Sequence, residues 1–256
     1  MLKRRIRYSV LFTWFLFLSV FNGWMVILVP SATARIIRVG LEPLPPLIIN
    51  ENAGYTVDLL KEIEKISDLQ FHIVIMPYNR AKRMLRQGRV DLIGHIPYHS
   101  ETEEFYSYAR ELDFKIDVKT DIYVVDKKNL RNIGILKIGI PRGNEEFAAK
   151  LLHIPKRNFY PGSLESLLQM LIRRRIDAFW FERSATISTL HKLGIKNLYY
   201  MKFPENPAPA GLAVRKSRKG IFLQEKLDSL LEKINVDRFL SGYSRFLVMP
   251  DTGMVH

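Results

Sequence analysis

The sequence predicts an α/β protein of two lobes with mainly parallel sheets, and three features of the chain support this fold class. Strand and helix signals alternate from residue 35 onward. The segments "MLRQGRVDLIG" from Met84 and "MLIRRRIDAFW" from Met170 share Met, Leu, an arginine and an aspartate in register. With 256 residues, 47% of them hydrophobic, the chain can bury the core of one large domain or of two smaller lobes. The repeated segment favours two lobes of one design.

The N-terminal 34 residues predict export. They consist of a basic start with Lys3, Arg4, Arg5 and Arg7, then an apolar run, then Ala-Thr-Ala at 32–34. This order is typical of a secretory signal peptide, here cleaved after Ala34. The alternative is a retained membrane anchor, because the run from Val10 to Val29 is about long enough to span a bilayer. In both cases the rest of the chain is expected outside the cytoplasm.

Charge and cysteine content narrow the class of protein further. The net charge of +13, less the +4 of the leader, leaves +9 on residues 35–256. Export argues against nucleic acid as the partner of this basic chain and leaves an envelope location, an anionic ligand or scattered surface lysines. The absence of cysteine excludes disulfides, a thiol nucleophile and lipid attachment at the cleavage site. We therefore expect a soluble monomer, not a lipoprotein, in the periplasm of a Gram-negative cell.

The first lobe is predicted from a strand–helix–strand–helix–strand order. Residues 35–41 (RIIRVGL) are typical of a buried strand, and 56–67 (TVDLLKEIEKIS) of a helix with one apolar face. A second strand is expected at 71–76. Asn79 can then cap a short helix that Gly88 ends, before a third strand at 90–96.

The second lobe repeats this order. Strands are expected at 121–125, 135–140 and 176–181, and helices at 145–152 and from a Ser163 cap to residue 175. The C-terminal part contains a strand pattern at 210–216 and helical patterns at 222–234 and 236–247. It is too short for a domain of its own and is expected to pack on one of the lobes.

Catalytic and metal-binding motifs are missing from the sequence. It has no GxSxG, HExxH, Walker or GxGxxG pattern. His95 and His99 have the spacing of metal ligands on a helix, but Pro97 lies between them, so loop histidines are expected there. Asp91 and Asp177 each lie at a strand start and are expected to bind backbone groups. We expect no enzymatic activity, no cofactor and no metal site.

Four segments together resemble the family 3 periplasmic solute-binding proteins, the polar amino-acid receptors of ABC importers. They are "RVGLEPLPPLIINENAGYTVDLLKEI", "MLRQGRVDLI", "IGIPRGNEE" and "GSLESLLQMLIRRRIDAFW". The segments from Gly54 to Leu60 and from Gly88 to Asp91 resemble the family pattern most closely. The resemblance implies a clamshell, or Venus flytrap, in which two α/β lobes joined by two hinge crossings close on a small solute. Lobe 1 would be 35–118 with 210–256, and lobe 2 would be 119–209.

The resemblance also implies a function. The protein would close on a small polar solute and present it to an ABC importer, whose membrane subunits recognise the closed form. Two alternatives stay open: a periplasmic sensor that signals ligand occupancy to a membrane partner, and an enzyme on the same scaffold.

The resemblance places candidate ligand contacts in both lobes. In lobe 1 they are Glu42 after the first strand, Tyr78 as a stacking aromatic, and His95, Ile96, Pro97 and Tyr98 along the rim. Glu42 could instead be an ordinary loop acid, and Tyr78 could cover the edge of the core. In lobe 2, the N–H groups of Gly143 and Asn144 at a helix start suit a ligand carboxylate. Glu182 matches the family's acid for an amino-acid ammonium, or is a solvated strand-end glutamate.

One position departs from the family pattern. Counting from Asp91, the place of the arginine that holds the ligand's α-carboxylate falls on Glu103. A cationic or polyol ligand would then suit the site better than an amino acid. Alternatively, the loop is shifted and Arg80, Arg110 or Arg142 replaces the arginine, or the acids at 101, 103 and 104 form a solvated loop.

Overall fold

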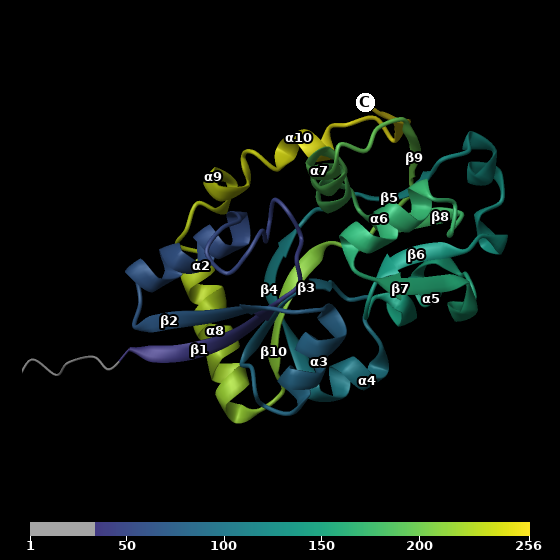
Figure 1. Cartoon of the computed structure of the whole chain (residues 1–256). Coiled ribbons are helices and arrows are strands. Elements are labelled where there is room, and N and C mark those ends of the chain that lie inside the picture. The colour runs from purple at the N-terminus through teal and green to yellow at the C-terminus, as the bar shows by residue number, and fades with distance from the viewer. Residues whose placement is uncertain (1–33) are drawn as a thin grey trace, which may run out of the picture. The chain divides into compact units, whose positions relative to one another are not determined.

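The computed structural model describes residues 34–256, which form two mixed sheets flanked by helices (Figure 1). The predicted signal peptide, and with it the alternative anchor at 10–29, lies outside the described residues. Among residues 34–256, no helix has the length and apolar character needed to cross a bilayer.

The first sheet has the strand order β2-β1-β3-β10-β4. Its strands are β1 (Arg35–Leu41), β2 (Leu69–Ile75), β3 (Leu92–Pro97), β4 (Ala109–Ile116) and β10 (Ala210–Arg215). β1 pairs in parallel with β2 and β3, and β10 runs antiparallel to β3 and β4. Its helices are α2 (Tyr55–Lys65), α3 (Tyr78–Arg86), α4 (Glu103–Tyr108) and α8 (Arg218–Leu231). The apolar faces of α2 and α8 pack on the sheet and bury residues such as Leu60 and Leu227.

The second sheet has the order β11-β9-β5-β8-β6-β7. Its strands are β5 (Thr120–Val124), β6 (Ile138–Pro141), β7 (Phe159–Gly162), β8 (Ala178–Glu182), β9 (Leu198–Lys202) and β11 (Thr252–Val255). α5 (Glu145–Leu152), α6 (Leu164–Ile172), α7 (Arg183–Leu193) and the short 3-10 helices η1 (Lys127–Arg131), η2 (Ile133–Ile135) and η3 (Lys156–Asn158) accompany it. Every residue of β5 and β8 is buried, as expected for central strands covered on both faces.

The predicted two-lobed α/β fold is confirmed, but the sheets are mixed rather than mainly parallel. The parallel pairs are β1 with β2 and β3, and β6 with β7 and β8. The strands that enter a sheet from the other lobe, β5, β10 and β11, run antiparallel to their neighbours. The crossing connections therefore account for the antiparallel part of each sheet.

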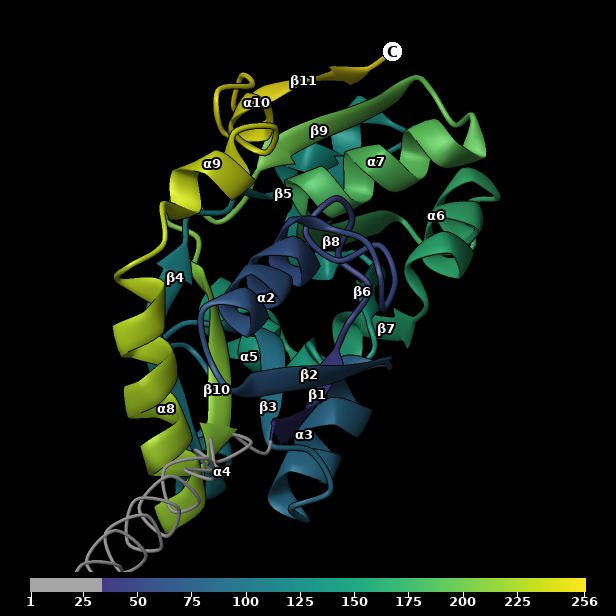
Figure 2. The same cartoon turned by 90° about the vertical axis from the view of Figure 1, so that its left-hand side faces the viewer.

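The chain passes between the sheets at 117–119, from β4 to β5, and at 203–209, from β9 to β10. A third passage follows α8: the chain continues through α9 (Val236–Leu240) and α10 (Ser244–Leu247) to β11 (Figure 2). β11 pairs with β9, so residues 252–255 belong to the second sheet, unlike the expected assignment of all of 210–256 to lobe 1. This pairing covers the edge that β9 would otherwise expose.

The two lobes repeat one local arrangement, as the matching segments predicted. Asp91 accepts the backbone N–H of Arg38 at 3.0 Å, and Asp177 accepts that of Lys137 at 2.9 Å. In return, the backbone N–H of Asp91 donates to the Arg38 carbonyl, and that of Asp177 to the Lys137 carbonyl. The expectation that both aspartates bind backbone groups is confirmed. They fix the start of β3 to β1 in the first lobe and the start of β8 to the start of β6 in the second.

Helix ends follow local chemistry with two differences from prediction. Ser163 caps α6, as predicted, by accepting from the backbone of Ser166. α3 begins at Tyr78, one residue before the predicted Asn79 cap. The predicted helix 236–247 is divided into α9 and α10 around Gly242, where an added Cβ would lie 2.2 Å from Tyr55 Oη.

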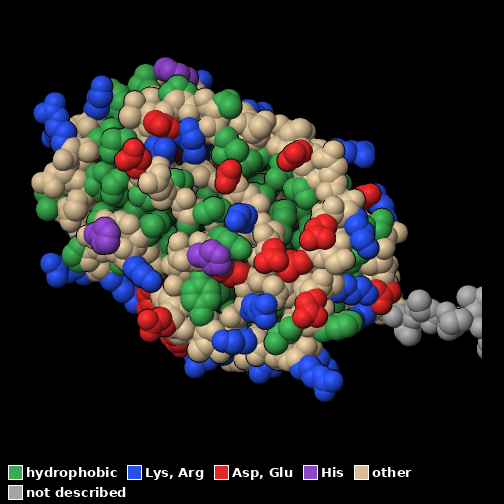
Figure 3. Space-filling view, turned by 180° about the vertical axis from the view of Figure 1, so that it is seen from behind, with side chains coloured by type: hydrophobic (Ala, Val, Ile, Leu, Met, Phe, Trp, Pro, Cys, Tyr) green, Lys and Arg blue, Asp and Glu red, His purple; other side chains and the backbone are tan. Residues whose placement is uncertain are grey.

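On the face in Figure 3, basic and acidic side chains are interspersed, in keeping with scattered surface charges.

Candidate ligand cavity between the lobes

A cavity of about 60 Å³ lies between the two sheets, beside both crossings. Both lobes contribute to its wall. The lining residues are Glu42, Leu44, His95, Ile96, Pro97, Val118, Thr120, Asn144, Phe147, Leu151, Trp180, Phe181, Glu182, Ala208, Pro209 and Ala210. A cavity that collects polar groups from two lobes is the usual form of a small-molecule site.

Glu42 follows β1 and is buried, with 7% of its surface exposed. Its two carboxylate oxygens are each 3.5 Å from Asn144 Nδ2 of the second lobe, at the limit of a hydrogen bond. The same amide donates to the Pro141 carbonyl at 3.0 Å. Burial raises the pKa of Glu42 to about 8, because the loss of water outweighs the opposing effects of Asn144, Lys82 and the Tyr78 backbone. At neutral pH this carboxyl therefore keeps its proton.

Glu182 ends β8 and caps α7. It accepts hydrogen bonds from the backbone N–H groups of Ser184 and Ala185 at 2.9 and 2.7 Å, and from the Ser184 hydroxyl at 2.7 Å. Tyr243 Oη, from the C-terminal segment, donates to it at 3.0 Å. Burial raises the pKa of Glu182 to about 6 despite these donors. Glu182 is thus an anion at neutral pH.

His95 lies on β3 and faces the cavity with a neutral ring. Its Nε2 is 2.7 Å from the hydroxyl of Thr56 on α2. Its Nδ1 is buried and has no hydrogen-bond partner among residues 34–256. Desolvation lowers the pKa of His95 to about 4, so the ring carries no charge at neutral pH.

The remaining wall is largely apolar. Trp180 of β8 and Phe147 of α5 pack with their ring centroids 5.9 Å apart. Trp180 Nε1 donates to the carbonyl of Phe203 at 2.6 Å, and the Thr120 hydroxyl donates to the same carbonyl at 3.0 Å. The polar atoms of these two side chains are therefore engaged with the second crossing and not with the cavity.

Contacts between the lobes surround the cavity. Lys82 Nζ of α3 donates to the Gly143 carbonyl of the second lobe at 3.0 Å and to Glu101 Oε1 at 3.2 Å. Gly143 has φ +106°, and an added Cβ would lie 2.4 Å from the backbone nitrogen of Asn79. At this point only glycine permits the observed approach of the lobes.

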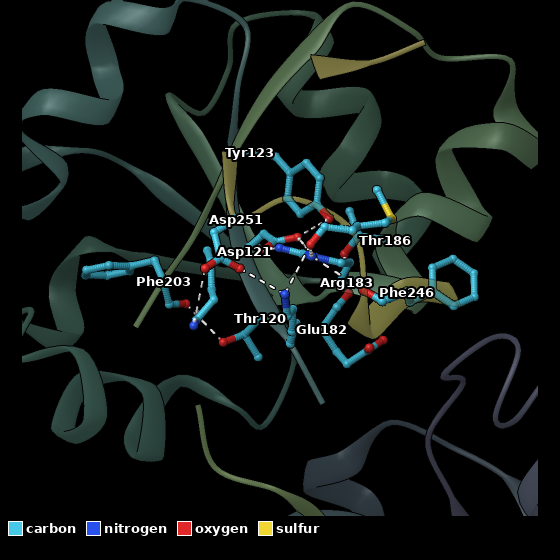
Figure 4. Close-up of polar contacts among 12 residues, drawn as sticks. Thr120, Asp121, Tyr123, Glu182, Arg183, Thr186, Phe203, Phe246 and Asp251 are labelled. Carbon is cyan, nitrogen blue, oxygen red and sulfur yellow. Dashed lines mark hydrogen bonds and ion pairs between the residues drawn. The ribbon is translucent and has the colours of Figure 1, made fainter. Parts of the chain in front are cut away.

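A buried ion pair fixes the C-terminal segment next to Glu182 (Figure 4). Arg183 and Asp121 have fully buried side chains and form a forked pair, with Nε–Oδ2 at 2.7 Å and Nη2–Oδ1 at 2.6 Å. Arg183 Nη1 also donates to the carbonyls of Met249 and Phe246 at 3.0 and 3.4 Å. The segment that carries Tyr243 is therefore held against the second sheet.

The structure brings six of the predicted site residues together in the cavity wall. They are Glu42, His95, Ile96, Pro97, Asn144 and Glu182. The other five lie elsewhere. Tyr78 is fully buried and donates to Glu101 Oε1 at 2.7 Å. Tyr98 lies under Lys115 Nζ, Gly143 stands at the contact between the lobes, and Arg142 and Glu103 are exposed.

The acidic cluster is oriented differently from the expectation. Glu103 is exposed in the first turn of α4, and Glu104 is exposed and pairs with Arg86 at 2.6 Å. Glu101 is the acid that enters the interior, with 2% of its surface exposed. The Tyr78 hydroxyl and the Lys82 ammonium donate hydrogen bonds to its Oε1 atom. None of these three acids lines the cavity.

The described cavity wall lacks the groups that were expected to bind a ligand carboxylate. Arg80, Arg110 and Arg142 are all exposed, and no Lys or Arg is among the described lining residues. At the start of α5, the Gly143 N–H donates to the chain's own Glu145 Oε2 at 2.7 Å, and the Asn144 N–H donates to the Pro141 carbonyl at 3.2 Å. The two N–H groups that were expected to hold a ligand carboxylate are thus bonded within the chain.

Most of the apolar wall escaped the sequence analysis. Leu44, Val118, Phe147, Leu151 and the stretch 208–210 carry no motif, and Trp180 and Phe181 were read only as part of a strand. The available signal was the apolar face of 145–152 and the position of 118 and 208–210 at the expected crossings.

Two α/β lobes joined by crossing strands, with a cavity between them, are the fold of the periplasmic binding proteins. The family model of the bacterial extracellular solute-binding proteins, family 3, matches residues 37–241, and the chain belongs to this family. No curated protein matches the sequence.

Many solved structures share the fold, among them the following three. The substrate-binding protein of an amino acid ABC transporter is 19% identical, over 82% of this chain and 99% of its own, with TM-score 0.67. A histidine kinase sensor domain similar to periplasmic binding proteins is 17% identical, over 88% and 99%, with TM-score 0.66. The ancestral amino acid-binding protein AncCDT-1, a precursor of cyclohexadienyl dehydratase, is 19% identical, over 81% and 94%, with TM-score 0.61. At these identities the likeness is one of fold alone.

Proposed function

We propose that this protein is an extracytoplasmic receptor that encloses a small polar solute between its lobes and presents it to an ABC importer. The observation that carries the proposal is the buried cavity whose polar groups come from both lobes. Glu42 and His95 belong to the first lobe, and Asn144 and Glu182 to the second. A ligand that contacts both sets binds the closed form better than an open one, so binding drives closure.

Export and periplasmic location are part of this proposal. The family's description as extracellular and the basic, apolar and small-residue leader support them. Cleavage after Ala34 would give a mature chain that begins at Arg35. Mass spectrometry of a periplasmic fraction should find that N-terminus, whereas recovery of uncleaved chain in the membrane fraction alone would favour an anchor at 10–29.

A sensory role is the second candidate, and the similarity to a histidine kinase sensor domain favours it. Both roles use the same closure and differ in the membrane partner. Purified ligand-loaded protein should stimulate ATP hydrolysis by the cognate importer in proteoliposomes if the role is transport. Failure there, together with ligand-dependent autophosphorylation of a membrane kinase, would establish the sensory role.

An enzymatic role is the third candidate, supported only by the likeness to a dehydratase precursor. Nuclear magnetic resonance spectra of a bound ligand, followed over hours with the protein present, would reveal any product. We expect the ligand to remain unchanged.

The receptor proposal is tested by a thermal-shift screen against amino acids, amines, sugars, polyols and organic acids. A ligand at about one hundred times its Kd adds about 2.7 kcal/mol to the free energy of unfolding. For a chain of this size, that corresponds to a rise in Tm of about 5–10 °C. Small-angle scattering should then show a smaller radius of gyration with that ligand. No shift with any class of solute would contradict a receptor function.

A further inference from the structure

We infer that the cavity takes a small organic cation that lacks a carboxylate, an ammonium group carried on a short apolar body. This inference rests on the proposed receptor function and names the class of solute. It follows from the balance of hydrogen-bond donors and acceptors in the wall, from the absence of an anion-holding group there, and from the unpartnered ring nitrogen of His95.

The polar side-chain atoms of the wall that lack a strong partner within the chain are mainly hydrogen-bond acceptors. Glu42 receives the Asn144 amide, at 3.5 Å from each oxygen, and a backbone hydrogen bond from Tyr78, and the Asn144 amide is already bonded to the Pro141 carbonyl at 3.0 Å. The hydroxyl of Thr120 and the indole of Trp180 donate to the Phe203 carbonyl. The one donor that faces the cavity from these groups is the proton of Glu42, which a bound cation would displace, and an ammonium group brings three donors and no acceptor.

His95 is the independent sign that a ligand atom belongs here. The side chain is buried, lines the cavity and leaves Nδ1 without a partner among the described residues. A buried polar atom without a partner costs free energy, and a ligand can recover it. When Nε2 carries the proton and donates to Thr56, Nδ1 is a further acceptor facing the cavity.

A carboxylate, by contrast, has no place in this wall. It would lie near the buried anion Glu182, in surroundings where like charges repel more strongly than in water. No described lining residue is Lys or Arg, and the N–H groups of Gly143 and Asn144 before α5 are bonded within the chain. Trp180, Phe147 and Phe181 offer an apolar surface to the rest of the ligand.

The test compares amines with the amino acids from which they differ only by the carboxylate. The pairs are isobutylamine and valine, putrescine and ornithine, and agmatine and arginine, each titrated by calorimetry into the purified protein. We expect at least one amine to bind at least about 30-fold more tightly than its amino acid, which is the low end for one uncompensated buried charge. Sodium chloride at the same ionic strength is the control for general salt effects.

A second readout follows the proton of Glu42. Because this carboxyl is protonated at neutral pH, an ammonium group bound beside it should displace that proton. The apparent binding enthalpy at pH near 7 should then differ between phosphate and HEPES buffers. A neutral polyol would leave the enthalpy the same in both.

The matched variants are Glu42→Gln and Glu103→Gln. The first removes the acid in the cavity and keeps the shape of the side chain, and it should weaken amine binding about 30-fold or more and abolish the buffer dependence. The second removes an exposed acid of α4 outside the cavity and should leave amine binding unchanged.

The outcomes separate the inference from the proposed function. An amino acid that binds as tightly as its amine, or a sugar or polyol that binds while all amines fail, overturns the inference and leaves the receptor function intact. Amine binding that Glu42→Gln does not weaken also overturns it. If no solute of any class binds, both the inference and the receptor function fail.

Discussion

Replacing Glu42 by Gln should change how the stability of the protein depends on pH. In the unfolded chain the Glu42 carboxyl has its ordinary pKa of 4.5, whereas burial raises it to about 8 in the folded protein. Below pH 4.5 both states are protonated, and the group has no effect. Between pH 4.5 and about 8 the unfolded state gives up this proton and the folded state keeps it, so rising pH favours unfolding. Above about 8 the effect is constant.

The size of this effect follows from the two pKa values. Each pKa unit is worth about 1.4 kcal/mol, so the free energy of unfolding of the natural protein should fall by up to about 5 kcal/mol between about pH 5 and about pH 9 because of Glu42. The Glu42→Gln variant has no titrating group at this position, so its free energy of unfolding should not show this fall. The difference in Tm between the natural protein and the variant should therefore change by up to about 10–20 °C over this range, in favour of the variant at high pH.

The assay is thermal unfolding of both proteins across this pH range, with urea unfolding at the two ends. Any fixed cost of burying the uncharged amide that Glu42→Gln introduces shifts the variant equally at both ends and cancels in the comparison. Glu103→Gln, in the exposed first turn of α4, is the control and should follow the natural protein. Parallel pH profiles for the natural protein and Glu42→Gln would show that Glu42 is well solvated, and the account of the cavity would be wrong.

Two further substitutions test the supports of the site. Arg183→Met leaves the buried Asp121 carboxylate without its cation and should lower the free energy of unfolding by about 3–5 kcal/mol in urea unfolding. It should also speed hydrogen exchange in 236–251, and an unchanged exchange rate there would argue that this segment is held by other contacts. Gly143→Ala places a Cβ against the Asn79 backbone across the cleft and should enlarge the radius of gyration in scattering experiments; an unchanged radius would mean that the lobes adjust locally.

The duplication of the lobes could be predicted because its cause is local. The helix turns before Asp91 and Asp177 have the same backbone hydrogen bonds, and both are marked by a Met-Leu pair seven and six residues before the aspartate. Pairing of β11 with β9 joins residues far apart in the sequence, and no pattern in "TGMV" marks it. Edge pairing of this kind is decided by which strand is left uncovered in the assembled sheet.

The resemblance placed residues in the cavity wall where they lie in or directly after a strand. Glu42 follows β1, His95 lies within β3 and Glu182 ends β8, so the positions carried over from the family pattern did not shift. Glu103 was placed by counting along a loop, and a count does not show which way a loop turns. Tyr78 and Lys82 draw Glu101 inward, and the following residues begin α4 on the surface.

The most direct test of the central claim is the distance between the lobes with and without ligand. The chain contains no cysteine, so Arg83→Cys on α3 and Arg173→Cys after α6 provide two exposed labelling sites, one in each lobe. Single-molecule energy transfer should show a more open or broader distribution without ligand and one closed population with the amine that gives the largest thermal shift. A distribution that stays the same at saturating ligand would contradict a receptor that works by closure.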